Sequence, residues 1–128
     1  QMTIKKLVVG SMFSMLLGSG VANADWGDVY YCQMTNLLEI TLEGEKRNYK
    51  LEKFQFKLDQ TKNAMVFGST GYFGNIVSKL VKGSNWPRQE KWYANDEYSV
   101  VYFNKGKFLY THNSLMGAVA LSADCDKF

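Results

Sequence analysis

The sequence contains few of the residues from which most catalytic and metal sites are built. It has one histidine and two cysteines among 128 residues. A typical zinc site needs several cysteine and histidine ligands, and this chain does not supply them. Any Ser-His-Asp or Cys-His site would have to use His112, yet no nucleophile-elbow motif accompanies it. We therefore expect a non-enzymatic protein with no catalytic residue, no bound metal and no cofactor.

The chain also lacks a strong charge imbalance. Its formal net charge is +3, but two of the basic residues, Lys5 and Lys6, precede an N-terminal apolar run. Without them, the 15 basic residues fall to 13 against 12 acidic ones, a net charge of +1. A nearly neutral surface gives no electrostatic reason to expect nucleic acid or an anionic membrane as the partner.

Long hydrophobic runs are absent apart from the one near the N-terminus. Leu7–Leu17 follows the two lysines and precedes a small-residue motif, Ala22-Asn23-Ala24, a pattern typical of a cleaved signal peptide. A membrane anchor is less favoured, because a spanning helix needs roughly 20 apolar residues. We predict a signal peptide over residues 1–24 and a single β domain over 25–128. The mature domain is expected in the periplasm or outside the cell, without membrane contact.

The two cysteines lie at opposite ends of this domain. Cysteines of an exported protein usually pair, which predicts a Cys32–Cys125 disulfide. A free thiol at each site and intermolecular pairing are the alternatives. Closing so long a loop removes about 4–5 kcal/mol of unfolded-state entropy in the simple chain model.

Alternating apolar and polar residues predict strands through most of the domain. Apart from Asn36, the even positions from Tyr30 to Leu42 are apolar, which predicts one long strand or two with a bend at Asn36. After a charged turn, the apolar phase shifts by one residue between Leu51 and Phe54. The shift predicts a β-bulge or a break at that point.

The C-terminal third, Lys91–Cys125, reads as a β-meander. Its predicted turns are Asn95–Glu97 and Asn104–Lys107, and its last strand contains Ala118–Asp124. Ile76–Val81 is ambiguous between a strand and a helical turn, and we favour a strand. The sequence thus predicts an all-β fold: a small antiparallel meander or barrel of about seven or eight strands, with the first and last strands joined by the disulfide.

The segment Gly68–Gly74 is unusual because three glycines surround two aromatic residues. It predicts either a loop that exposes its rings or a tight bend that turns them into the core. Large aromatic side chains also occupy both faces of the predicted C-terminal hairpins. Combining the loop with the aromatic strand gives a candidate partner-binding set: Ser69, Gly71, Tyr72, Phe73, Trp92 and Tyr93.

The order of these features resembles that of the periplasmic inhibitors of C-type lysozymes, which are small exported β-barrels. The matching residues are Tyr30-Tyr31-Cys32, the loop residues Ser69, Gly71 and Tyr72, an aromatic strand at Trp92, and the closing Cys125. The chain departs from that family where Thr70 separates the serine from the glycine, and no basic residue clearly matches the one that the family presents to lysozyme. The resemblance implies a protein partner. The chain also resembles small exported proteins of marine bacteria and their phages, which implies no activity.

Three functions therefore stay open at the level of sequence. The first is an exported binding domain, such as an inhibitor of a secreted or host enzyme, that acts as a monomer or weak homo-oligomer. The second is a lipocalin-like carrier that holds a small apolar ligand among aromatic residues. Those residues are Phe54, Phe56, Tyr98, Tyr102 and Tyr110. The third is a structural or surface-assembly role.

Overall fold

A computed structural model describes residues 24–81 and 91–128 of the chain. The predicted signal peptide, apart from Ala24, lies outside the described residues, as does the loop around Pro87. The described part is built from nine strands and contains no helix. The strands are β1 (Val29–Thr41), β2 (Lys46–Asn48), β3 (Lys53–Asp59), β4 (Ala64–Phe67), β5 (Val77–Lys79), β6 (Lys91–Asn95), β7 (Ser99–Asn104), β8 (Lys107–Ser114) and β9 (Gly117–Lys127).

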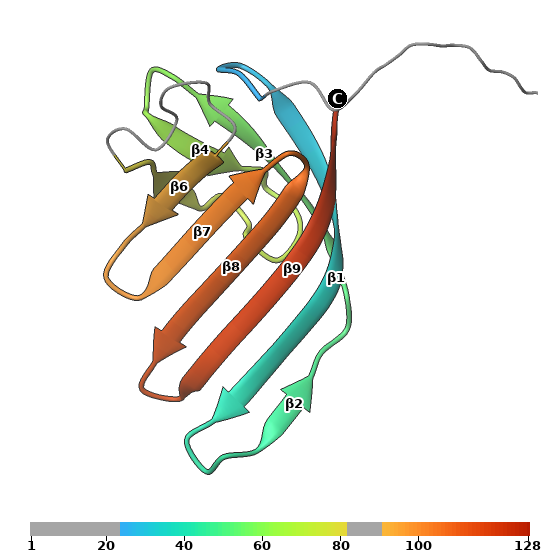
Figure 1. The fold of residues 1–128 in the computed structure, drawn as a ribbon, viewed down its shortest axis with the longest axis vertical. Helices are drawn as coiled ribbons and strands as arrows, with labels where there is room; N and C mark the ends of the chain where they lie inside the picture. The colour runs from blue at the N-terminus through green and yellow to red at the C-terminus, as the bar shows by residue number, and fades with distance from the viewer. Residues whose placement is uncertain (1–23, 82–90) are drawn as a thin grey trace, which may run out of the picture.

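The strands form one antiparallel sheet that curves into a nearly closed barrel (Figure 1). The order along the sheet is β5-β4-β3-β1-β9-β8-β7-β6, with β2 paired to the free edge of β1. The two end strands meet where Leu80 bridges to Ala94, and the Val81 amide donates to the Tyr93 carbonyl at 2.9 Å. The predicted all-β class is confirmed, and the predicted meander from Lys91 onward is present as β6 to β9.

The barrel interior is filled with aromatic rings. Phe67 packs on Phe73 with ring centroids 4.5 Å apart, and Phe54 packs on Phe108 at 4.8 Å. Such edge-on and tilted ring pairs add to the stability gained from burial alone. Trp92 closes one end of this core against Trp26, at 5.0 Å.

The disulfide joins the two strands that the sequence predicted. Cys32 of β1 and Cys125 of β9 are direct partners in the sheet register, and both side chains are buried. The disulfide is a feature of proteins in oxidising compartments. Within the described residues, no helix has the length and apolar character needed to cross a bilayer.

A β-bulge in the middle of β1 changes which side chains face the core. Thr35 and Asn36 both lie opposite Ser122 of β9 and hydrogen-bond to its hydroxyl at 2.7 Å. The predicted alternation therefore holds only as far as Met34. Beyond the bulge, Leu37 is buried, whereas the predicted core positions Leu38, Ile40 and Leu42 are not. A bulge inserts one extra residue, and so it moves every later side chain to the other face.

Two other predictions about the strands are confirmed. The strand pattern breaks between β2 and β3, where residues 49–52 belong to no strand. Ile76–Val81, left between strand and helix, forms the short strand β5 and the Leu80 bridge. In the β7–β8 turn, Lys105 and Gly106 both have positive φ, 50° and 80°, as a two-residue type I′ turn requires.

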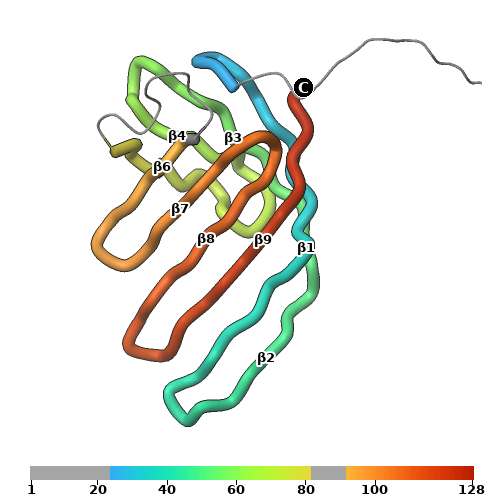
Figure 2. The backbone as a smooth tube through the Cα atoms, in the orientation of Figure 1, coloured from blue at the N-terminus to red at the C-terminus, as the bar shows by residue number. Residues whose placement is uncertain are grey.

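The long strands extend past the barrel at its lower end, as drawn in Figure 1. The tube in Figure 2 shows the β1–β2 and β8–β9 hairpins projecting side by side below the shorter strands. The pairing of β1 with β9 shows which side chains lie on each face of this extension. Glu39 and Val119 lie on the inner face, which continues the barrel wall, and Leu38 and Ala120 lie on the outer face. The extension therefore presents a separate surface on each side of the sheet.

Candidate binding site

The glycine-rich loop after β4 is anchored by one of its two aromatic residues. Phe73 is only 2% exposed and packs against Phe54, Phe67 and Tyr110, with centroid distances of 5.0, 4.5 and 4.9 Å. The adjacent Tyr72 stays 39% exposed. The loop thus places one ring in the core and presents the other to solvent.

Backbone hydrogen bonds hold this loop in a single shape. The Asn75 amide donates to the Gly68 carbonyl at 2.8 Å, and the Ile76 amide donates to the Phe73 carbonyl at 2.8 Å. Gly71 has a φ of +92°, and a Cβ at this position would lie 2.5 Å from the Lys53 carbonyl oxygen. Glycine is therefore required there by both conformation and space.

Tyr72 lies at the rim of a surface groove of about 350 Å³ on the inner face of the lower extension. The groove is formed where the loop approaches β1, β9 and the segment between β2 and β3. Its other lining residues are Leu37, Glu39, Tyr49, Lys50, Glu52 and Val119. The groove combines an apolar floor with two carboxylates, one ammonium group from Lys50 and two phenols.

The surroundings of both phenols in the groove raise their pKa values. The Tyr49 hydroxyl donates to Glu39 Oε1 at 2.6 Å, and this hydrogen bond raises the pKa of Tyr49. Partial burial raises the pKa of Tyr72, and the negative charges of Glu52 and Glu39 add to the effect. Tyrosine is protonated at neutral pH even without such shifts, so both hydroxyls are hydrogen-bond donors, and that of Tyr49 donates to Glu39.

A row of rings continues from Tyr72 across the inner face. Tyr110 follows at 6.5 Å, and His112 stacks on Tyr110 at 6.3 Å with an interplanar angle of 9°. Tyr98 lies at the far end, 6.4 Å from His112. The row forms an aromatic floor beside the groove.

The structure divides the predicted partner-binding set into three groups. Ser69, Gly71 and Tyr72 lie together on the exposed side of the loop. Phe73 and Trp92 are buried in the core, so for Phe73 the structure agrees with the alternative of a tight bend that turns a ring inward. Tyr93 lies on the outside of the barrel, where its ring packs on Tyr102 at 4.7 Å.

The sequence did not indicate which residues line the groove together with Tyr72. Glu39, Tyr49 and Glu52 precede Tyr72 by 33, 23 and 20 positions in the chain. No local motif connects these positions. They meet because the β1–β2 hairpin folds back beside the loop.

The residues predicted to surround a small apolar ligand do not share one chamber. Phe54 and Phe56 are buried and pack on other core rings. Tyr98 and Tyr102 are among the exposed large side chains. Tyr110 stands between them, at the edge of the core beside Phe73.

Within residues 24–81 and 91–128, no three His, Cys, Asp or Glu side chains are arranged to hold a metal ion. Comparisons with protein families, with curated proteins and with solved structures found no match to this chain.

Proposed function

We propose that this protein is an exported, non-enzymatic binding protein that acts on another protein through the Tyr72 loop and the groove beside it. The observation that carries the proposal is the anchoring of the loop: Phe73 is in the core while Tyr72 stands at the rim of the groove. The disulfide and the signal-peptide pattern of residues 1–24 support export.

A loop fixed in this way suits binding for a thermodynamic reason. Association costs free energy whenever flexible segments become ordered, and a loop already held by Phe73 and Gly71 avoids most of that cost. Tyrosine contributes a large contact area together with a hydroxyl donor, and tyrosines are enriched among the residues that dominate binding energy.

The chemistry of the groove also favours a particular kind of contact. The carboxylates of Glu39 and Glu52 are acceptors for an arginine, a lysine or a backbone amide of the partner. Leu37 and Val119 supply an apolar floor next to them. A protruding side chain with an aliphatic stem and a basic head would satisfy both parts.

The partner class that we propose first is a C-type lysozyme, from the resemblance carried by Cys32, the Ser69–Tyr72 loop and Cys125. Inhibition would then follow from the loop occupying the enzyme's substrate cleft. No chemical step by the bound protein is required, which agrees with the shortage of catalytic residue types in the sequence.

The test is lysozyme inhibition and binding by the purified, disulfide-bonded protein. We expect Tyr72→Ala to weaken binding at least thirtyfold, the equivalent of about 2 kcal/mol for a residue at the centre of an interface. The matched control is Tyr31→Ala, because Tyr31 is 46% exposed, does not line the groove and packs its ring on Phe128.

Two results would count against the proposal in different ways. If the unmodified protein binds lysozyme but Tyr72→Ala binds equally well, the loop is not the binding surface. If the unmodified protein does not bind lysozyme at all, the partner class is wrong.

A further inference from the structure

A tight turn over Asp25–Asp28 precedes β1. Gly27 has a φ of +91°, which suits the third position of a type II turn, and the Asp28 amide donates to the Asp25 carbonyl at 3.1 Å. The side chain of Asp28 returns to the start of the turn, because the Asp25 amide donates to Asp28 Oδ2 at 2.9 Å. Asp28 therefore contacts Asp25 through both its backbone and its carboxylate.

The turn is fixed to the rest of the barrel at two places. The Gly27 amide donates to the Leu58 carbonyl of β3 at 2.7 Å, and the Leu58 amide donates to the Asp28 carbonyl at 3.0 Å. The Trp26 ring packs edge-to-face on Trp92, which is fully buried. The position of Asp28 is therefore set by β3 and by the core as well as by the turn itself.

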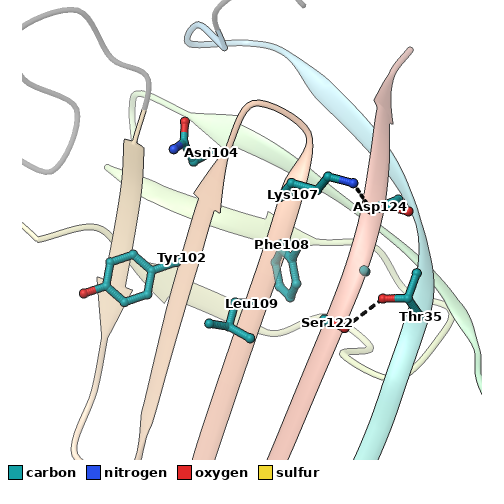
Figure 3. Close-up of a pocket in the computed structure, with 9 residues that line it drawn as sticks. Thr35, Tyr102, Asn104, Lys107, Phe108, Leu109, Ser122 and Asp124 are labelled. Carbon is teal, nitrogen blue, oxygen red and sulfur yellow. Dashed lines mark hydrogen bonds and ion pairs between the residues drawn. The ribbon is translucent and has the colours of Figure 1, made fainter.

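The carboxylate of Asp28 also holds a cation from the last strand. Lys127 Nζ of β9 lies 3.3 Å from Asp28 Oδ2. The Asp28 side chain is 20% exposed, whereas that of Asp124, which pairs with Lys107 in Figure 3, is 59% exposed. Water screens an exposed ion pair and weakens it. Asp28 is better protected from this effect than Asp124 is.

We propose that processing of the chain after Ala24 completes an ion-pair site at Asp28. Hydrolysis of the Ala24–Asp25 peptide bond by a signal peptidase consumes one water molecule. It leaves Ala24 as a carboxylate and the Asp25 nitrogen as an α-ammonium group, which is positively charged at neutral pH. The nitrogen that donates to Asp28 Oδ2 as a neutral amide then donates to it as a cation. Cleavage at this bond is part of the export proposed above, on which this inference rests.

The new charge strengthens a contact whose geometry already exists. A hydrogen bond between two charged groups is roughly twice as strong as one between neutral groups. The α-ammonium group is attached directly to the backbone of the turn, so holding it in place costs less conformational entropy than holding a long lysine side chain. Asp28 then joins the start of the processed chain to Lys127 of β9, and the turn keeps Trp26 against Trp92.

Two forms of the protein that begin at Asp25 isolate the effect of this charge. One has a free α-amino group, and the other is acetylated there, which keeps an N–H donor but removes the charge. Both forms lack Ala24, which is buried, so its loss cancels in the comparison. In urea unfolding at about pH 7 and low salt, monitored by tryptophan fluorescence, we expect the unfolding equilibrium constant to be about threefold larger for the acetylated form. Equal constants would overturn the proposal.

Asp28→Asn tests which carboxylate is involved. The variant loses the pair with Lys127 in both forms, but its free and acetylated forms should unfold with equal constants. The matched control is Asp126→Asn, which removes an exposed carboxylate next to Lys127 on the same strand. The control should keep the difference of about threefold. A difference that persists in Asp28→Asn, or one that is lost in Asp126→Asn, would contradict the pairing with Asp28.

The difference between the two forms should also depend on pH. An amino group that gains a negative partner on folding adds stability that is fully present below its unfolded pKa, about 7.7–8.0, and is lost as pH rises above it. The charged groups near the new N-terminus are Asp28, Lys127 and the Asp25 carboxylate, which accepts from the Trp26 amide. The Tyr30 phenol is affected by Asp28 as well. Because both forms contain these groups, their titrations cancel. We expect the difference to disappear by about pH 10, and an undiminished difference there would exclude the ammonium group as its cause.

The intact mass of the protein after export from a bacterial host tests the processing step. We expect a chain that begins at Asp25, and a chain that begins at any other residue would overturn the inference. The unfolding measurements need neither export nor a partner, and the mass needs no partner. Their failure is therefore distinct from a failure of Tyr72→Ala to weaken lysozyme binding.

Discussion

Replacing Phe73 with alanine separates the role of this ring from that of its neighbour. The Phe73 ring contacts Phe67, Tyr110 and Phe54 at centroid distances of 4.5 to 5.0 Å and is almost fully buried. Truncating such a side chain loses the transfer free energy of the ring and leaves a cavity, for a total of about 3–5 kcal/mol. Domains of this size have a total stability of about 5–15 kcal/mol, so the change would remove a large part of it.

Urea unfolding, monitored by tryptophan fluorescence, measures this loss. With a denaturant dependence of about 1–3 kcal/mol per molar urea, a loss of about 4 kcal/mol lowers the midpoint by about 2 M. Tyr72→Ala is the control, because its ring is partly exposed and meets the core only at its margin, through Phe73 at 5.0 Å and Tyr110 at 6.5 Å. We expect that variant to lose less than about 1 kcal/mol.

The opposite pattern would refute the anchoring argument. If Phe73→Ala costs less than about 1 kcal/mol, the ring does not hold the loop in the core. If Tyr72→Ala costs as much as Phe73→Ala, the two rings share one structural role, and a loss of binding in Tyr72→Ala would no longer identify a contact with the partner.

Two further predictions concern the central strands β1 and β9. Reducing the Cys32–Cys125 disulfide, whose cysteines are 93 positions apart, should lower the free energy of unfolding by about 4–5 kcal/mol, because the reduced unfolded chain regains loop entropy. A loss below about 2 kcal/mol, measured by comparing denaturation curves of the oxidised and reduced protein, would contradict this account. Burial, with a smaller effect from Asp28, raises the pKa of Tyr30 from 10.0 to about 12. As pH rises, Tyr30 therefore loses its proton in the unfolded state before it does so in the folded state. The folded state loses about 2–3 kcal/mol of stability between pH 10 and pH 12 for this reason. Tyr30→Phe should lose less stability over that interval, and equal losses in the two proteins would show that another group is responsible.

The C-terminal meander was predictable because local signals agree with one another there. Val101 and Phe103 alternate with Val100 and Tyr102, and a turn with glycine at the required position follows. The structure confirms the strands, the turn and the disulfide near the end of the last strand. Where the alternation of apolar residues and the turn residues predict the same strands, local sequence alone is enough to predict the local structure.

The far end of β1 could not be predicted in the same way. The even positions continue to be apolar through Leu38 and Ile40, so periodicity assigns them to the core. The bulge that overrides the pattern depends on Ser122, whose hydroxyl hydrogen-bonds to both Thr35 and Asn36. That residue lies 86 or 87 positions away in the chain, and no local pattern reports its presence.

The candidate site shows a related limit. The glycines predicted a constrained loop, and Gly71 confirms it, but adjacent aromatics give no periodic signal about which ring turns inward. For Trp92 a signal did exist. Trp92 alternates with Tyr93 and is paired in register with Phe103, a core position, so hairpin pairing would have assigned the tryptophan to the interior.

The bulge in β1 also decides which side chains stand beside Tyr72. It leaves Glu39 and Val119 on the inner face of the sheet extension, and it turns Leu38 and Ile40 to the outer face. Without the extra residue, Leu38 rather than Glu39 would face the groove. The hydrogen bond that the Tyr49 hydroxyl donates to Glu39 would then be lost. The groove beside the loop therefore depends on the contact between Ser122 and the bulge, far from Tyr72 in the sequence.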